Sequence, residues 1–538
     1  MRTTNLLLLA LALGCAPGRG SVEIPASAAA PLTRAERSGW TETSRFDDVV
    51  AFIDSLDAPA LLHDTTFGET VRGRELPLVV AGAPSARAAD VRATGRTRVL
   101  VFANIHAGEV EGKEVAQMLL RELARGEHAA WLDSLVLLVA PIYNADGNEQ
   151  VSTENRAEQH GPFAGVGTRE NAQGLDLNRD HMKLDSPEAR ALVRLLDEYD
   201  PHVVVDLHTT NGTHHAYHLT YAPPLHPATD SALVTTLRER WLPSVTRDMA
   251  ADGWLAWYYG NLPIREWGMT GERGWYSFDY RPRFNTHYVG LRNRFGILSE
   301  AYSYASFEER VRATQAFVRW VLDWAYAHAG EIRRTTDAAD ATDLQGRVLP
   351  LRAEIASAGD TLILLGAIEE RTNPISGATY QARLDSVAPE RMPNYDRFAP
   401  VESGTVPRAY IVSGASPRVV ELLRAHGVRL EPGPTGEGAT IDYDLETFAI
   451  DSTRASSRAF QGHLEREVFG RWCGMAGHIG EDDWVVPMDQ PLARLAFMLL
   501  EPRSPDGVVD WNFVDEEILA GYYPIRRAPV GDTAPPCP

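Results

Sequence analysis

Cysteine is scarce in this sequence of 538 residues, which has only three, at positions 15, 473 and 537. None lies near the polar clusters described below, which argues against a thiolate metal site and against a cysteine nucleophile. Beyond the N-terminal segment only Cys473 and Cys537 remain. They could pair in an oxidising compartment, or Cys473 could be a small buried apolar residue and Cys537 part of a loose tail. The sequence leaves both readings open.

Basic residues are also few compared with acidic ones. The chain has 52 Lys and Arg against 73 Asp and Glu, which gives a net charge of −21. A surface this acidic repels nucleic acid and anionic lipid, so we expect neither as a partner. Hydrophobic residues make up 44% and charged residues 23% of the chain, the composition of a soluble globular protein with a large core. The length favours two folded units.

The sequence lacks an apolar run long enough to span a bilayer. Residues 6–13, which follow a positive start at Arg2, are all Leu or Ala and read as the apolar core of a secretory signal. The following Gly14-Cys15 resembles a bacterial lipoprotein box, in which Cys15 would carry the lipid. An ordinary cleaved signal is the alternative. We therefore expect an exported protein, periplasmic, held in the cell envelope or secreted, that meets the membrane only through a lipid anchor on Cys15.

Composition divides the chain into segments. An Ala/Ser/Pro/Gly-rich stretch follows the signal, strand and helix patterns then alternate to about residue 330, and a polar boundary precedes a strand-rich part with a Pro-rich end. No internal repeat is apparent. The expected organisation is a signal peptide at 1–15, a flexible tether at 16–45, a catalytic domain at 46–335, a C-terminal accessory domain at 345–530 and a disordered tail at 531–538.

The catalytic segment alternates short apolar runs with helical patterns. Strand-like runs occur at 99–105, 135–142, 203–207 and 295–298, and helical patterns occur at 111–123, from 187 onward and at 307–327. This alternation predicts an α/β fold whose sheet is covered by helices on both faces. The part beyond residue 345 is predicted to be a smaller β-rich or α/β domain.

Polar residues follow the predicted strands at the points where the strands end. His106 follows the first of these runs, His208 the third and Glu300 the fourth, while Asn144 and Asp146 follow the second. In an open α/β sheet, ligands bind beyond the carboxyl ends of the strands. If the strands are parallel neighbours, these side chains meet at one edge of the sheet.

His106 and Glu109 form an H-x-x-E pair, in which an imidazole and a carboxylate three residues apart can share one cation. With His208 as a third ligand, the set becomes two histidines and a glutamate with an open fourth position, a catalytic zinc arrangement. The pair alone is a weak signal, because chance matches are common and a loop histidine with a solvated glutamate gives the same letters. Its weight depends on the surrounding sequence.

The surrounding sequence resembles the funnelin zinc carboxypeptidases, the carboxypeptidase A-like metallopeptidases. The matching segments, in the order of that family, are residues 67–77, 104–114, 141–147, 174–179 and 206–208, followed by Glu300. The resemblance covers roughly residues 46–330. It implies a mixed, mainly parallel eight-stranded sheet between helices, with zinc at the strand ends.

The resemblance also implies roles for individual residues. The implied zinc ligands are His106, Glu109 and His208. Glu300 is the implied general base, which would later pass its proton to the leaving amine. Asn178 and Arg179 would bind the terminal carboxylate of a peptide substrate, Arg179 through paired hydrogen bonds.

Two further roles have competing candidates. An arginine should polarise the scissile carbonyl; Arg156 is favoured by its distance from the turn at 146–147, and Arg169 is the alternative. A tyrosine upstream of Glu300 should line the site, and both Tyr280 and Tyr276 have suitable spacing. We therefore expect Arg156 to polarise the carbonyl, and we take Tyr280 as the site tyrosine, although spacing does not separate it firmly from Tyr276.

The function implied by the resemblance is that of a zinc-dependent carboxypeptidase acting on peptides with a free C-terminal carboxylate. One alternative is a zinc hydrolase of N-acyl amino acids, because residues 174–179 and 206–210 also resemble the aspartoacylase and succinylglutamate desuccinylase group. Cleavage of cell-wall peptides is a second alternative. A binding protein with an inactive enzyme fold would be expected to lack a ligand or the base, whereas all four residues are present.

Overall fold

The computed structural model describes residues 30–263, 271–435 and 440–537, and residues Pro31–Pro538 form one compact unit. The predicted signal peptide, Cys15 and the first half of the predicted tether lie outside the described residues. Within the described ranges, no helix combines the length and apolar character needed to cross a membrane.

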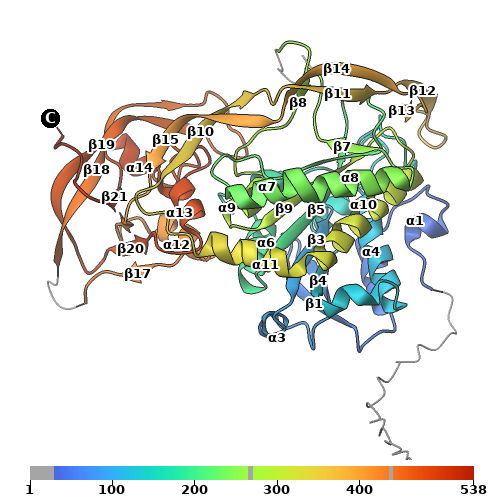
Figure 1. The fold of residues 1–538 in the computed structure, drawn as a ribbon, viewed down its shortest axis with the longest axis horizontal. Coiled ribbons are helices and arrows are strands. Elements are labelled where there is room, and N and C mark those ends of the chain that lie inside the picture. The colour runs from blue at the N-terminus through green and yellow to red at the C-terminus, as the bar shows by residue number, and fades with distance from the viewer. Residues whose placement is uncertain (1–29, 264–270, 436–439, 538) are drawn as a thin grey trace, which may run out of the picture. The chain divides into compact units, whose positions relative to one another are not determined.

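An eight-stranded sheet forms the centre of the first half of the chain (Figure 1). Its strand order is β1-β2-β4-β3-β5-β9-β6-β7. The strands are β1 (Leu62–Glu69), β2 (Glu75–Ala81), β3 (Thr97–Ala103), β4 (Leu135–Ala140), β5 (Val203–Thr210), β6 (Leu219–Ala222), β7 (Ala256–Tyr258) and β9 (Phe295–Tyr302). The central run β4-β3-β5-β9 is parallel. β2 and β6 join its two sides in antiparallel orientation, and the edge strands β1 and β7 pair with them, β1 antiparallel to β2 and β7 parallel to β6. The predicted mixed, mainly parallel sheet is confirmed.

Alternate residues of the central strands enter two different cores. In β3, Val99 and Val101 join a core with helices α4 (Glu111–Ala124) and α10 (Phe307–Ala327). The intervening residues Leu100 and Phe102 join a core with helices α6 (Pro187–Glu198) and α9 (Asn285–Leu291). Because successive side chains of a strand point to opposite faces, a strand that is apolar throughout must be covered on both sides. The predicted covering of both faces is confirmed.

Local signals in the sequence set the starts of the long helices. Ser186 caps α6 by accepting a hydrogen bond from the backbone N–H of Ala189, and proline occupies the first helical position. Ser306 caps α10, and Glu309 bonds back to the Ser306 backbone in a capping box. Both helices begin where the sequence predicts, and α10 ends at residue 327 as predicted.

The other helical elements of this half are short or lie at the edges of the two cores. They are α1 (Arg34–Arg37), α2 (Phe46–Asp54), α3 (Ala88–Ala93), α5 (Ala145–Asn148), α7 (Ser231–Thr236), α8 (Leu242–Ala251), α11 (Ala329–Asp340), the π-helical stretch Leu237–Trp241 that joins α7 to α8, and the helical turns at Ala129–Asp133 and Leu177–Arg179. The Leu177–Arg179 turn carries the predicted substrate-binding pair.

Residues 348–405 form a long two-stranded ribbon (Figure 1). The ribbon strands, β10 (Val348–Ala356), β11 (Asp360–Leu365), β12 (Ile368–Thr372), β13 (Thr379–Arg383), β14 (Ala388–Tyr395) and β15 (Arg397–Thr405), pair β10 with β15, β11 with β14 and β12 with β13. β14 also pairs in parallel with β8 (Trp275–Tyr276) of the first half. The ribbon is therefore tied to the segment that precedes α9.

The rest of the C-terminal half is a six-stranded sheet with three helices. The strands, in the order β17-β20-β16-β21-β18-β19, are β16 (Ala409–Val412), β17 (Glu431–Pro432), β18 (Ile441–Ala455), β19 (Arg466–Ile479), β20 (Trp484–Pro487) and β21 (Ile525–Ala528). The helices are α12 (Pro417–Ala425), α13 (Ala493–Leu500) and α14 (Asp515–Leu519). Leu422 of α12 and Leu499 of α13 belong to the same core as Leu195 of α6. The predicted C-terminal part is β-rich, and its core is continuous with that of the first half.

The prediction of a flexible tether is wrong for residues 31–45. Thr33 begins α1 with a capping box to Glu36. The hydroxyl of Thr43 and the backbone N–H of Ser44 donate to the buried carboxylate of Glu114 on α4, at 2.8 and 2.7 Å. These hydrogen bonds to a buried charge hold the segment together with the burial of Ala35 and the packing of Trp40 against the core, and its composition gave no sign of this order.

The C-terminal tail also differs from the predicted disordered segment. Cys473 on β19 and Cys537 form a disulfide with a Cα–Cα distance of 5.1 Å. The backbone N–H of Ala534 donates to Glu446 Oε1 at 2.7 Å, and the N–H of Gly474 donates to the Ala534 carbonyl at 3.0 Å. The tail is fixed alongside β19, and the pairing that the sequence left open is present.

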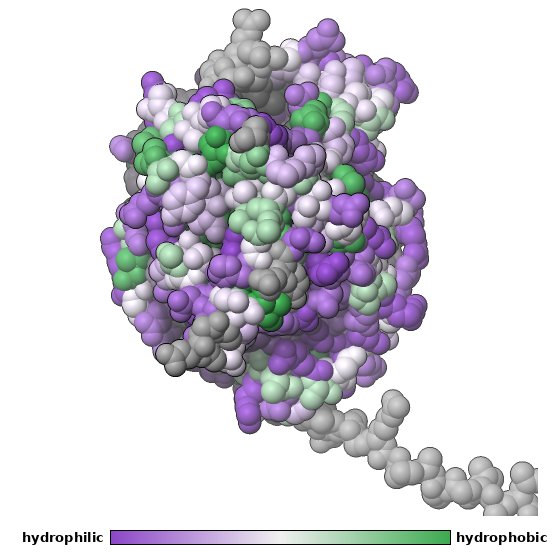
Figure 2. Space-filling model, turned by 90° about the vertical axis from the view of Figure 1, so that its left-hand side faces the viewer, coloured by the Kyte–Doolittle hydropathy of each residue, from purple (hydrophilic) through white to green (hydrophobic). Residues whose placement is uncertain are grey.

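Polar side chains cover most of the molecular face shown in Figure 2, which is the end formed by the C-terminal half. Apolar side chains appear there in small separate groups. Exposed apolar residues of this half include Phe469, Met475 and Leu519. Scattered apolar residues are normal on soluble proteins and do not by themselves mark a binding surface.

Six buried histidines should make the fold sensitive to acid. Burial lowers the pKa of His202, His215, His226 and His426 to about 3, and that of His181 and His287 to about 4. The unfolded chain, with ordinary histidine pKa values near 6.5, binds more protons than the folded chain below that pH. The stability that these neutral histidines contribute is therefore present above pH 6.5 and is lost as the pH falls toward 4.

We expect the Tm of the metal-free protein to fall steeply between pH 7 and pH 5 in scanning calorimetry. Each of these histidines lowers the free energy of unfolding by about 1.4 kcal/mol per pH unit below its unfolded pKa. Metal-free protein keeps acid release of a cation out of the result. A Tm that stays constant over this range would contradict the assignment of these side chains as neutral and buried.

Candidate active site

The side chains predicted to meet at the sheet edge do so in the structure. His106 lies three residues beyond the end of β3. His208 and Glu300 lie near the carboxyl ends of strands β5 and β9, each two residues before the last residue of its strand. His208 and Glu300 are paired in the parallel register of these two strands. Parallel pairing places the carboxyl ends of the three strands side by side, as the sequence argument required.

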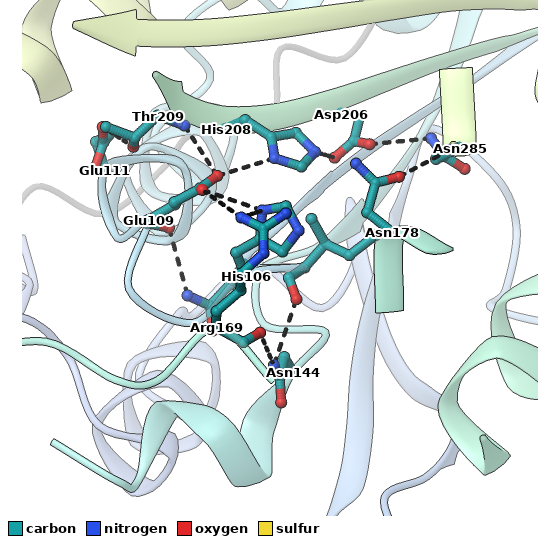
Figure 3. Close-up of polar contacts among 12 residues, drawn as sticks. His106, Glu109, Glu111, Asn144, Arg169, Asn178, Asp206, His208, Thr209 and Asn285 are labelled. Atoms are coloured by element: carbon teal, nitrogen blue, oxygen red, sulfur yellow. Dashed lines mark hydrogen bonds and ion pairs between the residues drawn. The ribbon is translucent and has the colours of Figure 1, made fainter. Parts of the chain in front are cut away.

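His106, Glu109 and His208 form a compact donor set (Figure 3). Nδ1 of His106 lies 3.0 Å from Glu109 Oε1, and Nδ1 of His208 lies 2.9 Å from Glu109 Oε2. One donor atom from each residue lies within 4.8 Å of the other two, and each residue is at most 4% exposed. Two imidazole nitrogens and a carboxylate oxygen that converge in this way fit a zinc ion with one position left open.

Each histidine of the set has a carboxylate on its other ring nitrogen. His106 Nε2 is hydrogen-bonded to Asp176 Oδ1 at 3.0 Å, and His208 Nε2 lies 3.0 Å from Asp206 Oδ1. The second contact is an ion pair whose angle falls short of a hydrogen bond. Asp206 is itself held by Asn285, whose Nδ2 donates to its Oδ2 at 3.2 Å (Figure 3). Such carboxylates orient the rings so that both Nδ1 atoms face the shared point.

Electrostatics favours an ionised Glu109 in this cluster. Burial opposes the charge, but the neighbouring His106 and the hydrogen bonds from both histidines hold the pKa of Glu109 well below its usual range. Although burial lowers the pKa of His208, the charges of Asp206 and Glu109 raise it well above the ordinary value. The carboxylates of the cluster therefore stabilise positive charge. A bound metal cation can replace the imidazole protons as the carrier of that charge.

Glu300 faces the same cavity of about 200 Å³ as the donor set. Burial raises the pKa of Glu300 to about 8; the charge of His208 opposes this rise, and that of Glu109 adds to it. A carboxylate whose pKa lies near neutrality can both accept and return a proton. The position and environment of Glu300 suit a general base.

Asn178 and Arg179 also line this cavity. They lie on the Leu177–Arg179 turn, which Asp176 caps by accepting from the backbone N–H of Asn178 at 2.9 Å. Asn178 Oδ1 accepts from the backbone N–H of Asn285 at 2.9 Å, which fixes its amide. The Arg179 guanidinium lies 4.0 Å from the centre of the Phe284 ring, and its Nη1 donates to the Asn178 carbonyl.

Both candidate arginines reach the cavity, but their surroundings differ. Arg156 donates to Glu109, to Gln159, to the Thr209 carbonyl and to the Ser303 hydroxyl, at 2.9 to 3.1 Å. Arg169 is held from one side by Asp176, with its Nε at 2.9 Å and its Nη2 at 2.8 Å. Its side chain is 41% exposed, compared with 20% for Arg156. The two arginines therefore differ in how many donors remain available to a ligand.

The predicted placement of Tyr280 in the site is wrong. Its hydroxyl accepts a hydrogen bond from the Ala353 backbone at 3.0 Å, and its ring packs 5.0 Å from Phe398, both in the C-terminal half. The alternative, Tyr276, stacks on Tyr395 at 4.3 Å and also lies outside the cavity. Contacts with ribbon residues hold both rings outside the cavity. The sequence of the catalytic segment alone does not reveal these contacts.

The aromatic residues that line the cavity are Tyr259, Phe278 and Phe284. The hydroxyl of Tyr259 accepts from Asn261 Nδ2 at 3.1 Å, and its ring meets Phe278 edge to face at 5.4 Å. Burial and the nearby Glu300 charge raise the pKa of Tyr259. Sequence reasoning missed Tyr259 because it lies 41 residues before Glu300, far from the expected spacing. Its position at the end of the short strand β7 was the available signal.

Comparisons with known proteins agree with this geometry. Residues 49–277 match the profile of the family described as zinc carboxypeptidase. The chain is 21% identical over 490 residues to Carboxypeptidase 2 of Trichophyton rubrum, an alignment that covers 86% of this chain and 82% of that protein. This alignment therefore extends well beyond residues 49–277, into the C-terminal half of the chain.

Solved structures with a similar fold include a metallo-carboxypeptidase from Burkholderia cenocepacia, at 16% identity over 53% of this chain and 70% of that one, with a TM-score of 0.40. A metallo-carboxypeptidase from Pseudomonas aeruginosa, in complex with (2-guanidinoethylmercapto)succinic acid, is 17% identical over 54% of this chain and 70% of that one, with a TM-score of 0.38. The family match therefore identifies residues 49–277 as a zinc carboxypeptidase domain, and the carboxypeptidase relatives support a metallopeptidase.

Proposed function

We propose that this protein is a zinc carboxypeptidase that removes the C-terminal residue of peptides, with His106, Glu109 and His208 as the metal ligands. The observation that carries the proposal is that these ligands, Glu300 and Arg179 all line one cavity of about 200 Å³. A cation site and a proton acceptor serve any amide hydrolase. The guanidinium in the same small cavity is what favours a substrate with a free carboxylate.

The residues of the chain divide the reaction between them. When bound, zinc supplies positive charge that polarises the scissile carbonyl and favours ionisation of water and of Glu300. Glu300 accepts a proton from the attacking water and returns it to the leaving amine. Arg179 and Asn178 hold the terminal carboxylate and so set which peptide bond reaches Glu300. Asp176 and Asp206 keep the two imidazoles in the orientation that binds the metal.

Arg169 suits the role of carbonyl-polarising residue better than Arg156, the residue favoured by spacing. Four of the five N–H groups of Arg156 donate to protein acceptors, including Glu109, so it serves mainly to hold a metal ligand in place. Arg169 uses Nε and Nη2 to bind Asp176, while its Nη1 lies 3.3 Å from His106 Nδ1, next to the donor set. That Nη1 can donate to a carbonyl oxygen placed beside the metal.

The wall of the cavity around Arg179 is apolar or uncharged. Phe278, Phe284, Thr286 and Leu298 form it, and the acids among the lining residues are the ligand Glu109 and the base Glu300. A basic side chain at the substrate's C-terminus would find no dedicated partner in this wall, whereas an apolar one would bury its surface. We therefore infer a preference for an apolar C-terminal residue.

We also propose that the protein is exported, with the N-terminal segment as its signal and Cys15 as the site of lipid attachment. The support from the folded chain is the disulfide between Cys473 and Cys537, because such bonds persist in oxidising compartments.

A hydrolysis screen of zinc-loaded protein tests the substrate class. We expect single C-terminal residues to be released from free peptides ending in Phe or Leu, with chelator-sensitive rates at least tenfold above those for peptides ending in Lys or Glu. N-acyl amino acids and muropeptides should remain intact. Cleavage confined to either of those two classes would overturn the carboxypeptidase proposal.

A further inference from the structure

We infer that the turn at residues 460–463, at the tip of the β18–β19 hairpin, is a positioning element of the hydrolytic site and acts through Gln461. This inference rests on the proposed function, which supplies the site that is positioned. It gives the C-terminal half a role in the reaction. No residue beyond 345 carries a motif that suggests one.

The turn is a tight two-residue hairpin connection. Strands β18 and β19 pair from Ile441 with Ile479 to Ala455 with Arg466, and the chain continues beyond them to the tip. Phe460 and His463 exchange both backbone hydrogen bonds, at 2.8 and 3.0 Å. Between them, Gln461 and Gly462 have φ values of 53° and 84°, which is the left-handed pair that such a turn requires.

Gln461 places its side chain on the residue before the substrate-binding turn. Its Oε1 accepts a hydrogen bond from the backbone N–H of Asp176 at 2.9 Å. The Asp176 carboxylate accepts from His106 at 3.0 Å and from Arg169 at 2.9 Å, and it caps the turn that carries Asn178 and Arg179. One peptide group therefore connects Gln461 to a metal ligand, to the carbonyl-polarising candidate and to the carboxylate-binding pair.

The tip is anchored independently of Gln461. His463 Nε2 is hydrogen-bonded to Asp185 Oδ2 at 2.8 Å. The buried guanidinium of Arg283 lies 5.0 Å from the Phe460 ring and 4.7 Å from the Trp511 ring, and its Nη2 donates to Glu465 at 2.6 Å. Loss of the Gln461 side chain should therefore leave the tip in place and remove only the contact with Asp176.

The backbone conformation of Gln461 supports a role beyond turn formation. Glycine adopts a positive φ freely, whereas a long side chain with a Cβ is disfavoured there. A residue chosen only to close the turn would be glycine or asparagine. A glutamine at this position is explained by its contact with Asp176. Asp176 is only 6% exposed, so water has little access to its backbone N–H, and the Gln461 side chain supplies the acceptor.

The variant Gln461→Gly separates the role in the site from the role in the fold. It relaxes the left-handed residue, which offsets the stability lost with the hydrogen bond to Asp176, so we expect little change in the Tm. Without the acceptor, the Asp176 peptide is free to shift. We expect KM for free peptides to rise three- to tenfold, and the zinc dissociation constant, measured by competition with a chromogenic chelator, to rise by a similar factor.

Two further variants complete the test. Gln461→Glu keeps an acceptor oxygen and should restore zinc affinity to within about twofold of wild type. Gln381→Ala removes a matched glutamine on the ribbon, which accepts from His214 at 2.9 Å and does not reach Asp176, so it should change neither constant. The inference is overturned if Gln461→Gly leaves the zinc affinity and KM unchanged, lowers the Tm together with them, or behaves like Gln381→Ala. Because zinc affinity and Tm need no substrate, failure of the proposed peptidase activity would be seen separately.

Discussion

Replacing Glu300 with Gln should lower kcat by about 10²- to 10⁴-fold, the range expected when a general base is removed. Glutamine preserves the shape of the side chain and cannot accept a proton. The metal ligands are untouched, so the variant should bind one zinc per chain as tightly as wild type and unfold at the same temperature. The measurement is kcat on a free peptide, made alongside zinc content and Tm.

A buried glutamate elsewhere in the chain provides the control. Glu501 accepts hydrogen bonds from Tyr410 at 2.6 Å and from Trp472 at 3.2 Å, and burial raises its pKa as it raises that of Glu300. Glu501→Gln should keep activity within about twofold of wild type. If Glu300→Gln retains more than a tenth of the wild-type kcat with zinc bound, Glu300 is not the base.

Replacing Arg179 with Ala should lower kcat/KM for peptides with a free C-terminus by about 10²- to 10³-fold. Loss of a charge-assisted contact inside a desolvated cavity costs about 3–4 kcal/mol, and Ala leaves the substrate carboxylate unpaired. C-terminally amidated twins of the same peptides should be poor substrates of the wild type and should lose less than threefold further. The measurement is the ratio of kcat/KM for each free and amidated pair.

Arg179→Lys refines this test. Lysine keeps the charge but loses the planar fork that matches a carboxylate, so its kcat/KM on free peptides should lie between those of Ala and wild type. Equal losses on free and amidated peptides would mean that Arg179 supports the turn at 177–179 and does not read the substrate carboxylate. The exopeptidase proposal would then lose its main support.

The central sheet and the metal set were accessible from sequence because both are local patterns. Residues 99–103 of β3 are all apolar, a run typical of a strand covered on two faces, and His106 lies three residues beyond the end of the strand. His208 and Glu300 follow equally clear strand patterns. The parallel register that pairs them is a consequence of the α/β alternation, so their meeting needed no knowledge of distant contacts.

Side chains that depend on contacts with the C-terminal half could not be placed in this way. Tyr280 has suitable spacing from Glu300, yet Ala353 and Phe398 hold it outside the cavity. Gln461 lies 285 positions from the residue it contacts, and no periodicity or motif marks it. Spacing favoured Arg156 over Arg169, and only the full set of hydrogen-bond partners shows which guanidinium has more donors left for a ligand.

Composition misled the prediction at both ends of the chain for a related reason. Residues 31–45 and the Pro-rich tail are poor in apolar side chains, a pattern typical of disorder. The first is held by hydrogen bonds to Glu114 and by the core contacts of Ala35 and Trp40, and the second by the Cys473–Cys537 disulfide. Such bonds depend on a partner far away in the sequence.

The most direct test of the central claim is a zinc titration of metal-free protein, followed by release of C-terminal residues from a free peptide. Activity should rise linearly with added zinc, reach its maximum at one zinc per chain and remain constant beyond it. His208→Ala should bind zinc at least 100-fold more weakly and stay inactive over the same range. Full activity without metal, or in His208→Ala, would contradict a hydrolytic centre built on His106, Glu109 and His208.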